Sequence, residues 1–264
     1  MDLIDIGANL AHESFEHDRA GVISASFAAG VSQLIVTGAT LDSSQAAIDL
    51  ARLYPQRLYA TAGVHPHHAG ELAEQALPRL RALLQAPGVV AAGECGLDYF
   101  RNYSPPASQR LAFERQLRLA AECGLPLFLH QREAHADFVA ALREHGTALR
   151  GVAHCFTGGE AELAAYLDLG LHIGVTGWIC DERRGQSLQA LVHRIPSGRL
   201  LLETDAPYLL PRDLKQRVEA RRNEPRFLPH IAAEVARLRG ESLETCSANS
   251  TAAARALFGL PVPA

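Results

Sequence analysis

The chain has 264 residues, of which 48% are hydrophobic and 20% are charged. This is the composition of a globular protein with a large core, and it excludes a disordered chain. The net charge of -4 provides no overall positive field, so a nucleic-acid partner would have to be held by a local basic patch or by a metal ion.

The cysteine content and the chain's first residues indicate a cellular location. Five cysteines, an odd number without a CxxC pair, do not suggest a disulfide framework and suit a reducing compartment. The beginning of the chain shows no basic segment followed by an apolar one, so no signal peptide is expected. No apolar run approaches the ~20 residues that a membrane span requires. We therefore expect a cytoplasmic monomer that does not associate with membranes.

Short apolar runs rich in Val, Ile and Leu recur along the chain. Because they do not alternate between polar and apolar residues, each suits a parallel strand that is buried on both faces. The eight predicted strands span residues 3–9, 33–39, 58–66, 89–98, 126–132, 151–156, 172–178 and 199–207.

Amphipathic segments lie between these runs. The clearest predicted helices span residues 40–55, which opens on Asp and Ser caps, and 108–124, 134–146 and 159–170, which each end on a glycine. The one irregular region is a long polar loop at residues 207–225. Eight strand–helix units over about 250 residues are what a TIM (β/α)₈ barrel requires. The expected fold class is therefore α/β, a TIM barrel formed by a single domain of residues 1–264.

Acidic and imidazole residues stand where several of the predicted strands end. They are His65, Glu94, His130, His154, Glu203 and Asp205. A single histidine at a strand end is more often structural, but the carboxyl ends of barrel strands all meet at one rim, where barrel enzymes hold their chemistry. Several such groups at one rim are better explained by a divalent cation, such as Zn²⁺, Mn²⁺, Fe²⁺ or Mg²⁺.

Glu94 is the most informative of these residues, because it follows a small apolar run and stands between Gly93 and Cys95. A buried carboxylate needs a partner. We predict that this partner is a metal ion, with Gly93 and Gly96 leaving space beside the side chain, although an arginine from a neighbouring loop is an alternative. A bound ion can lower the pKa of water and generate a hydroxide nucleophile near neutral pH.

Other polar residues give weaker signals. We interpret His67 and His68 as loop surface, and Cys95 and Cys155 as core residues that point away from the predicted ligands. A dense basic run is either a solvated surface or a contact to substrate phosphates. It comprises Arg212, Lys215, Arg217, Arg221 and Arg222.

Six motifs occur in order along the chain: AGVHPH, GECGLD, HCFTG, TGWICDERRG, ETDAPYLLPRD and RRNEP. Together they resemble the TatD-related deoxyribonucleases, specifically the TatD branch, from the first strand to the last helix. The resemblance implies a TIM-barrel, metal-dependent phosphodiester hydrolase. It further implies a Mg²⁺-dependent 3′→5′ exonuclease on single-stranded DNA and RNA, with a role in DNA repair or nucleic acid turnover.

The resemblance also implies roles for individual residues. The family's metal ligands correspond to Glu94, His130 and His154. Asp205 corresponds to a further ligand or a general base, and the catalytic residues near the scissile phosphate correspond to His65 and Glu203. In the predicted mechanism the ion polarises a phosphate oxygen and positions the attacking water, while Asp205 accepts a proton from that water or ligates the ion. His65 contacts the phosphate or the leaving oxygen.

The first strand departs from the pattern of the wider family, which ends this strand with His-x-His. The stretch DIGANL instead has Gly7 and Asn9 at these positions. The TatD branch itself resembles this form, with glycine and asparagine in place of the two histidines. We therefore expect one firmly held ion, with a second one weak, substrate-assisted or absent. The loss of two imidazoles favours Mg²⁺, with Mn²⁺ or Zn²⁺ as alternatives.

Candidate substrate contacts lie around the same rim. Arg101 and Arg222 are predicted to hold the phosphate backbone, and Tyr99 or Phe100 to stack on a terminal base. Two other functions stay open at this point. One is an amidohydrolase-type barrel that cleaves a C–N or ester bond in a small molecule, and the other is a barrel that only binds.

Overall fold

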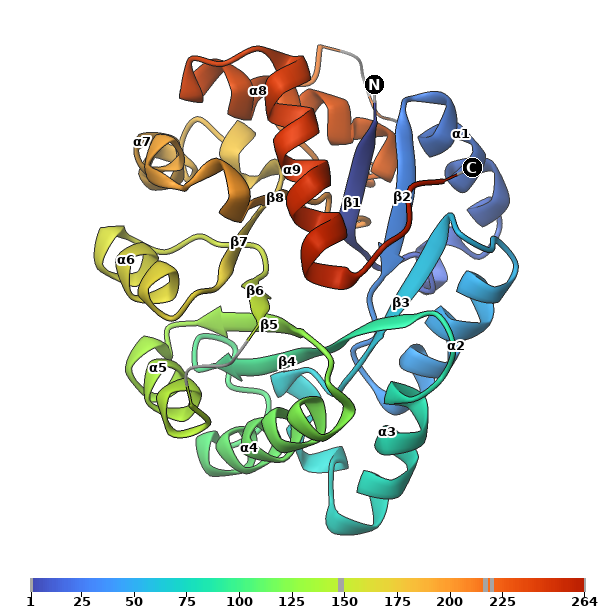
Figure 1. The fold of residues 1–264 in the computed structure, drawn as a ribbon, viewed down its shortest axis with the longest axis vertical. Helices are drawn as coiled ribbons and strands as arrows, with labels where there is room; N and C mark the ends of the chain where they lie inside the picture. The colour runs from blue at the N-terminus through green and yellow to red at the C-terminus, as the bar shows by residue number, and fades with distance from the viewer. Residues whose placement is uncertain (1, 147–149, 216–217, 219–220, 264) are drawn as a thin grey trace.

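A computed structural model describes residues 2–146, 150–215, 218 and 221–263 (Figure 1). Its eight parallel strands form one sheet in chain order, which confirms the predicted TIM barrel. The strands are β1 (Leu3–Ala8), β2 (Val31–Val36), β3 (Leu58–Ala62), β4 (Val89–Asp98), β5 (Leu127–Arg132), β6 (Gly151–Ala153), β7 (His172–Val175) and β8 (Leu200–Leu202).

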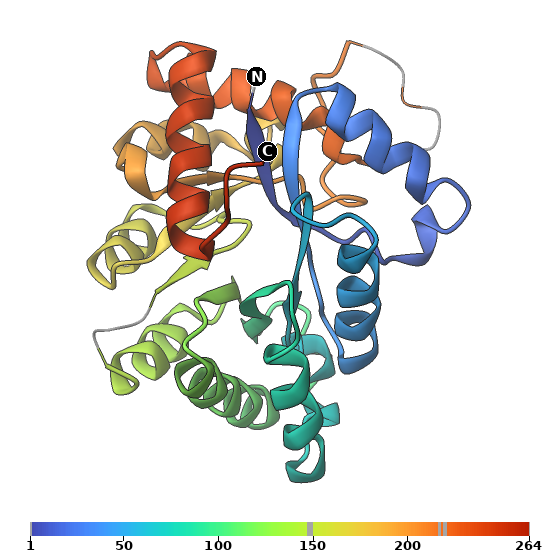
Figure 2. The same cartoon turned by 45° about the vertical axis from the view of Figure 1, so that its right-hand side comes forward.

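Helices surround the strands (Figure 2). They are α1 (Arg19–Ala28), α2 (Leu41–Arg52), α3 (Leu77–Leu84), α4 (Pro106–Cys123), α5 (His135–Glu144), α6 (Glu160–Asp168), α7 (Gln186–Leu191), α8 (Leu228–Arg239) and α9 (Leu243–Phe258). The four predicted helices are confirmed, three of them with slightly shorter bounds, whereas α4 begins two residues earlier than predicted. Thr40 and Ser43 cap α2 together, because the Thr40 side chain accepts from the Ser43 N–H and the Ser43 hydroxyl accepts from the Thr40 N–H, so of the predicted Asp and Ser caps a serine is confirmed. Within the described residues, no helix is both long and apolar enough to cross a membrane.

The strand ends differ from the prediction in a way that matters for the site. Several strands end earlier than predicted, so His65, His154 and Glu203 stand just beyond β3, β6 and β8. The chain changes direction there: Cys155 and Asp205 both adopt positive φ, at 47° and 54°. At these two residues the backbone therefore leaves the hydrogen-bonded ladder of strands. The side chains of the adjacent residues then face the rim at the carboxyl end of the barrel.

The barrel interior is apolar and is closed at its amino-terminal end by α9 (Figure 1). Buried side chains of β1, β2, β4, β5, β6 and β8 pack with Ala254, Leu257 and Phe258 of this helix. The Thr251 hydroxyl also donates to the carbonyl of Asp2, just before β1. The amino-terminal end is thus filled by a helix, which leaves the carboxyl end as the open face of the barrel.

Hydrogen bonds join β1 to the residues that directly follow β8. Among the strand pairs formed by described residues, none joins these two strands directly. Instead, the buried Asp5 carboxylate accepts from the Thr204 N–H at 3.0 Å and from its hydroxyl at 2.6 Å. The Asp205 N–H donates to Gly7 O at 2.8 Å. Burial raises the pKa of Asp5 to about 7, although the Thr204 hydrogen bonds oppose this rise.

Candidate metal centre

A pocket of 400 Å³ opens at the carboxyl end of the barrel. Polar side chains from the ends of several strands line it, as the strand-end pattern predicted. They include His65, Glu94, His130, His154 and Asp205, together with Asn9, His67, Asp98 and Arg101.

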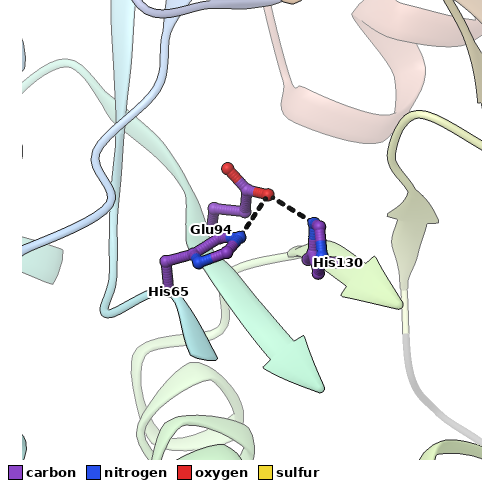
Figure 3. Close-up of side chains that lie close together, drawn as sticks. All are labelled: His65, Glu94 and His130. Carbon is purple, nitrogen blue, oxygen red and sulfur yellow. Dashed lines mark ion pairs between the residues drawn. The ribbon is translucent and has the colours of Figure 1, made fainter. Parts of the chain in front are cut away.

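Glu94 lies at the centre of this pocket and faces imidazoles (Figure 3). Its Oε1 is 2.9 Å from His130 Nδ1, 3.3 Å from His65 Nε2 and 3.7 Å from His154 Nε2. Burial alone would raise the pKa of Glu94, but His65 and His154 outweigh it and hold the pKa well below its usual value. The ion pairs of Glu94 within the described residues are with imidazoles and not with the arginine considered as an alternative.

The orientation of His65 follows from the turn after β3. Its backbone N–H donates to Ala39 O at 2.9 Å, and its Nδ1 accepts from the His67 N–H at 3.1 Å. The other ring nitrogen is thereby directed at Glu94. Burial lowers the pKa of His65 to about 4, although the Glu94 charge opposes this shift, so its imidazole is neutral near pH 7.

His154 and Asp205 form the other side of the pocket. Glu203 Oε2 lies 2.6 Å from His154 Nδ1, which leaves Nε2 pointing toward Asp205 Oδ1 at 3.9 Å. Burial lowers the pKa of His154, but the charges of Glu203 and Glu94 outweigh it and raise the pKa to about 10. Burial raises the pKa of Asp205 to about 7 against the opposing charge of His154. Without an ion, His154 is therefore a cation at neutral pH.

Asp98 and His67 also belong to this site, and the sequence analysis missed both. Asp98 Oδ2 lies 3.1 Å from His130 Nε2 and 3.0 Å from His67 Nε2, so the interpretation of His67 as loop surface was wrong. His68 is exposed, although it also lines the pocket. By bonding to His130 Nε2, Asp98 directs His130 Nδ1 toward Glu94. Asp98 is four residues beyond Glu94 on β4, and this even spacing could have identified it because it places both side chains on one face.

Replacing Asp98 with asparagine is expected to weaken divalent metal binding by about 10- to 100-fold, because His130 loses the carboxylate that fixes its ring. Isothermal titration with Mn²⁺ would measure the change. Asp137→Asn is the matched control, since Asp137 bonds Tyr99 and Arg110 outside the pocket. Equal metal affinities in the two variants would show that Asp98 does not position His130 for metal binding.

The donor atoms fit a divalent cation. Two groups of three residues each offer ligand atoms that lie within 4.8 Å of one another: His65, Glu94 and His130, and His154, Cys155 and Asp205. The two groups lie side by side, because His154 Nε2 of the second group is 3.7 Å from Glu94 Oε1 of the first. Imidazole nitrogens are typical ligands of Zn²⁺, and carboxylates are typical ligands of Mg²⁺ and Mn²⁺, so this mixed set suits a divalent cation. Cys155 also lines the pocket, so its interpretation as a core residue was wrong, whereas Cys95 is buried.

The absence of His-x-His in β1 has a steric reason. A Cβ atom at Gly7 would lie 2.7 Å from Glu203 Oε2 and 2.8 Å from Phe128 Cζ. Glycine therefore makes room for the carboxylate that holds His154. Asn9 Nδ2 donates to Asp205 Oδ1 at 3.0 Å, so this amide orients a candidate base.

Gly93 and Gly96 do not leave space beside Glu94, contrary to the prediction. Both have positive φ, and a Cβ atom at either position would overlap a carbonyl oxygen of β5, that of Phe128 or of His130. These glycines allow β4 to approach β5 closely. That approach brings His130 beside Glu94.

Of the predicted substrate contacts, the structure brings only Arg101 to the pocket lining. The Tyr99 hydroxyl donates to Asp137 at 2.7 Å, and Arg222 donates to Asp18 at 2.6 Å and to Glu224 at 3.0 Å. Elsewhere in the basic run, Arg212 lies 3.4 Å from Asp181, and Arg217 falls outside the described residues. The predicted loop is confirmed where it is described, since no helix or strand lies between Leu202 and Pro225 there.

Known proteins resemble this chain along nearly its whole length. The model of the family described as TatD related DNase matches residues 4–259. The "3'-5' ssDNA/RNA exonuclease TatD" of Erwinia amylovora is 52% identical, over 98% of this chain and 100% of the relative. The protein of the same name from Edwardsiella piscicida is 53% identical over the same shares.

Solved structures agree with these sequence relatives. A TatD family hydrolase from Entamoeba histolytica has a TM-score of 0.91 at 29% identity, covering 99% of each chain. The TatD homologue YjjV from Escherichia coli has a TM-score of 0.89 at 28% identity, covering 98% of each chain.

Proposed function

Because this chain belongs to the TatD-related DNase family, we propose that it is a metal-dependent hydrolase that removes nucleotides from the 3′ end of single-stranded DNA and RNA. Relatives that carry this activity in their names are 52% and 53% identical over 98% of the chain. The observation that carries the proposal is the ionised Glu94, which faces three imidazoles at the open end of the barrel with Asp205 nearby.

The residues proposed to hold the ion are Glu94, His130, His154 and Asp205. A divalent ion at this position polarises a phosphate oxygen and lowers the pKa of water. We propose Mg²⁺, with Mn²⁺ and Zn²⁺ as alternatives, because Gly7 of β1 and Asn9 just beyond it stand in place of two imidazoles and the remaining site is rich in carboxylates. One firmly bound ion is proposed, with the second position weaker.

Asp205 is the proposed general base. Its Oδ1 is oriented by Asn9 at 3.0 Å, and burial raises its pKa to about 7, against the opposing charge of His154. A carboxylate held in this orientation beside the attacking water can accept its proton. Glu203 acts on the reaction through His154, whose ring it holds at 2.6 Å.

His65 and Arg101 are proposed to contact the scissile phosphate. The neutral imidazole of His65 can share a hydrogen bond with a phosphate or leaving oxygen without adding charge. Arg101 lies on the pocket lining, and its guanidinium can bind a phosphate with two parallel hydrogen bonds. Tyr99 and Arg222 would have to leave their present partners to reach a substrate.

Digestion of a 5′-labelled single-stranded oligonucleotide tests the proposal. A ladder of shortened labelled products is expected with Mg²⁺ and should disappear with EDTA. A second oligonucleotide, blocked by phosphorothioate bonds at its 3′ end, should resist digestion. No cleavage with Mg²⁺, Mn²⁺ or Zn²⁺ would overturn the proposal, and assays with amides and lactones would then test the small-molecule alternative.

We further propose that the enzyme works as a monomer in the cytoplasm, in DNA repair or nucleic acid turnover. All five cysteines carry free thiols, which suits a reducing compartment. Sedimentation equilibrium would test the oligomeric state.

A further inference from the structure

A third group of metal-ligating side chains lies outside the catalytic pocket. It combines Cys180 of the short helix η4 (Gly177–Cys180), Asp213 of the loop after β8, and His230 in the first turn of α8. One ligand atom from each lies within 4.8 Å of the others, and Asp213 Oδ1 is 2.7 Å from His230 Nε2. Residues 33 and 17 positions apart are thus brought together by the fold alone.

The chemistry of these ligands differs from that of the catalytic pocket. A thiolate with an imidazole and a carboxylate is a typical Zn²⁺ ligand set, whereas Mg²⁺ avoids sulfur. Cys180 is buried, and burial together with the Asp213 charge raises the pKa of its thiol. A cation that binds the thiol displaces its proton, which is released to solvent.

The surroundings give a cation access to the three ligands. A cavity of 380 Å³ reaches Cys180 and Asp213, and Asp213 and His230 are partly exposed. Two arginines on the cavity wall, Arg183 and Arg212, lie 4.0 Å and 3.4 Å from the buried Asp181 carboxylate, which also pairs with Arg184 at 2.8 Å. Asp181 therefore offsets only part of the positive charge beside the cavity.

A further carboxylate stands on the same side of α8. Glu234 is one helical turn beyond His230, and its charge also acts on the Cys180 thiol. Its carboxylate now pairs with Arg237 at 2.7 Å. The Glu234 carboxylate adds negative charge near the three ligands. A tetrahedral ion bound by these three ligands has a fourth coordination position, which Glu234 can approach.

We propose that Cys180, Asp213 and His230 form a second metal site, which binds Zn²⁺ and ties the loop after β8 to η4 and α8. The tied segments also form part of the catalytic pocket: η4 supplies Trp178, and the loop supplies Tyr208 and Leu209. An ion at this site holds one wall of the pocket in place without contacting the catalytic residues. The site does not depend on the proposed nuclease function.

Cobalt spectroscopy of the whole protein tests the site. Titration of the wild-type protein with Co²⁺ is expected to produce a thiolate-to-cobalt charge-transfer band in the near ultraviolet. The band should vanish in Cys180→Ser and persist in Cys155→Ser. Cys155→Ser is the matched control because Cys155 is the thiol in the catalytic pocket. Absence of the band in the wild type, or its loss only in Cys155→Ser, would overturn the proposal.

Two further variants remove ligands at the surface, where folding is not at risk. Asp213→Asn and His230→Gln are each expected to weaken Zn²⁺ binding by more than about 100-fold, because losing a ligand costs more than losing its hydrogen-bond partner. Glu94→Gln should keep the cobalt–thiolate band. Zn²⁺ should also slow amide hydrogen exchange in residues 208–215 of the wild type but not of Asp213→Asn, and equal protection in both would count against the site.

Discussion

Replacing Glu94 with glutamine is expected to lower the rate of oligonucleotide digestion by at least about 1,000-fold, which corresponds to about 4 kcal/mol of lost transition-state stabilisation. Glu94 Oε1 is the single atom that three imidazoles approach, so its charge is central to holding the ion. Glutamine keeps the volume of the side chain and a carbonyl oxygen. Initial rates with Mg²⁺ and the 5′-labelled substrate would measure the loss.

The variant must also stay folded for this result to be meaningful. Glutamine can still accept a hydrogen bond from an imidazole, and melting curves should show a folded barrel. Glu160→Gln is the matched control, because Glu160 pairs with the exposed Arg194 and neither residue lines the pocket. A folded Glu94→Gln protein with near wild-type activity would refute the catalytic centre assigned here.

Replacing Asp205 with asparagine is expected to reduce the rate by about 100- to 10,000-fold, the usual contribution of a general base. The amide is nearly isosteric and can still accept from Asn9, but it cannot take a proton from water. Single-turnover rates at saturating Mg²⁺ would measure this change apart from metal binding. A rate within a factor of about three of wild type would exclude Asp205 as the base.

The same variant carries a prediction about pH. The pKa of Asp205 is raised to about 7, above its usual 3.8, so the folded protein retains a proton there at pH values between these two. A cation that uses Asp205 must displace this proton, so binding weakens as the pH falls through 7. Mn²⁺ titrations between about pH 6 and about pH 8 should show a smaller pH dependence in Asp205→Asn than in wild type or Asp137→Asn.

The sequence was sufficient to predict the barrel and the meeting of distant polar residues. The apolar runs identified all eight strands, and residues as far apart as Glu94, His154 and Asp205 converge because the carboxyl ends of parallel strands share a rim. Strand ends were predicted less well. His154 and Glu203 follow apolar runs as strand residues do, and only the turn at Cys155 and Asp205 shows where the ladder stops.

The partners of charged residues could not be predicted. Arg222 belongs to a basic run that suggested phosphate contacts, but its partner Asp18 lies 204 positions earlier in the chain. Nothing in the local sequence identifies such a pair, because it forms only when α1 and the loop after β8 pack together. The roles of Asp98 and Gly7 were hidden for the same reason, since each depends on a neighbouring strand.

The join between β1 and the segment after β8 has a consequence for how the protein is made. Gly7 and Asn9 leave the ribosome early, whereas Glu203 and Asp205 emerge only after more than three quarters of the chain has been synthesised. A nascent chain that ends before β8 carries Glu94, His130 and His154, but neither the proposed base nor the carboxylate that holds His154. Such a chain would lack the complete catalytic centre, so nuclease activity is expected only after the segment that follows β8 has been synthesised and has joined β1.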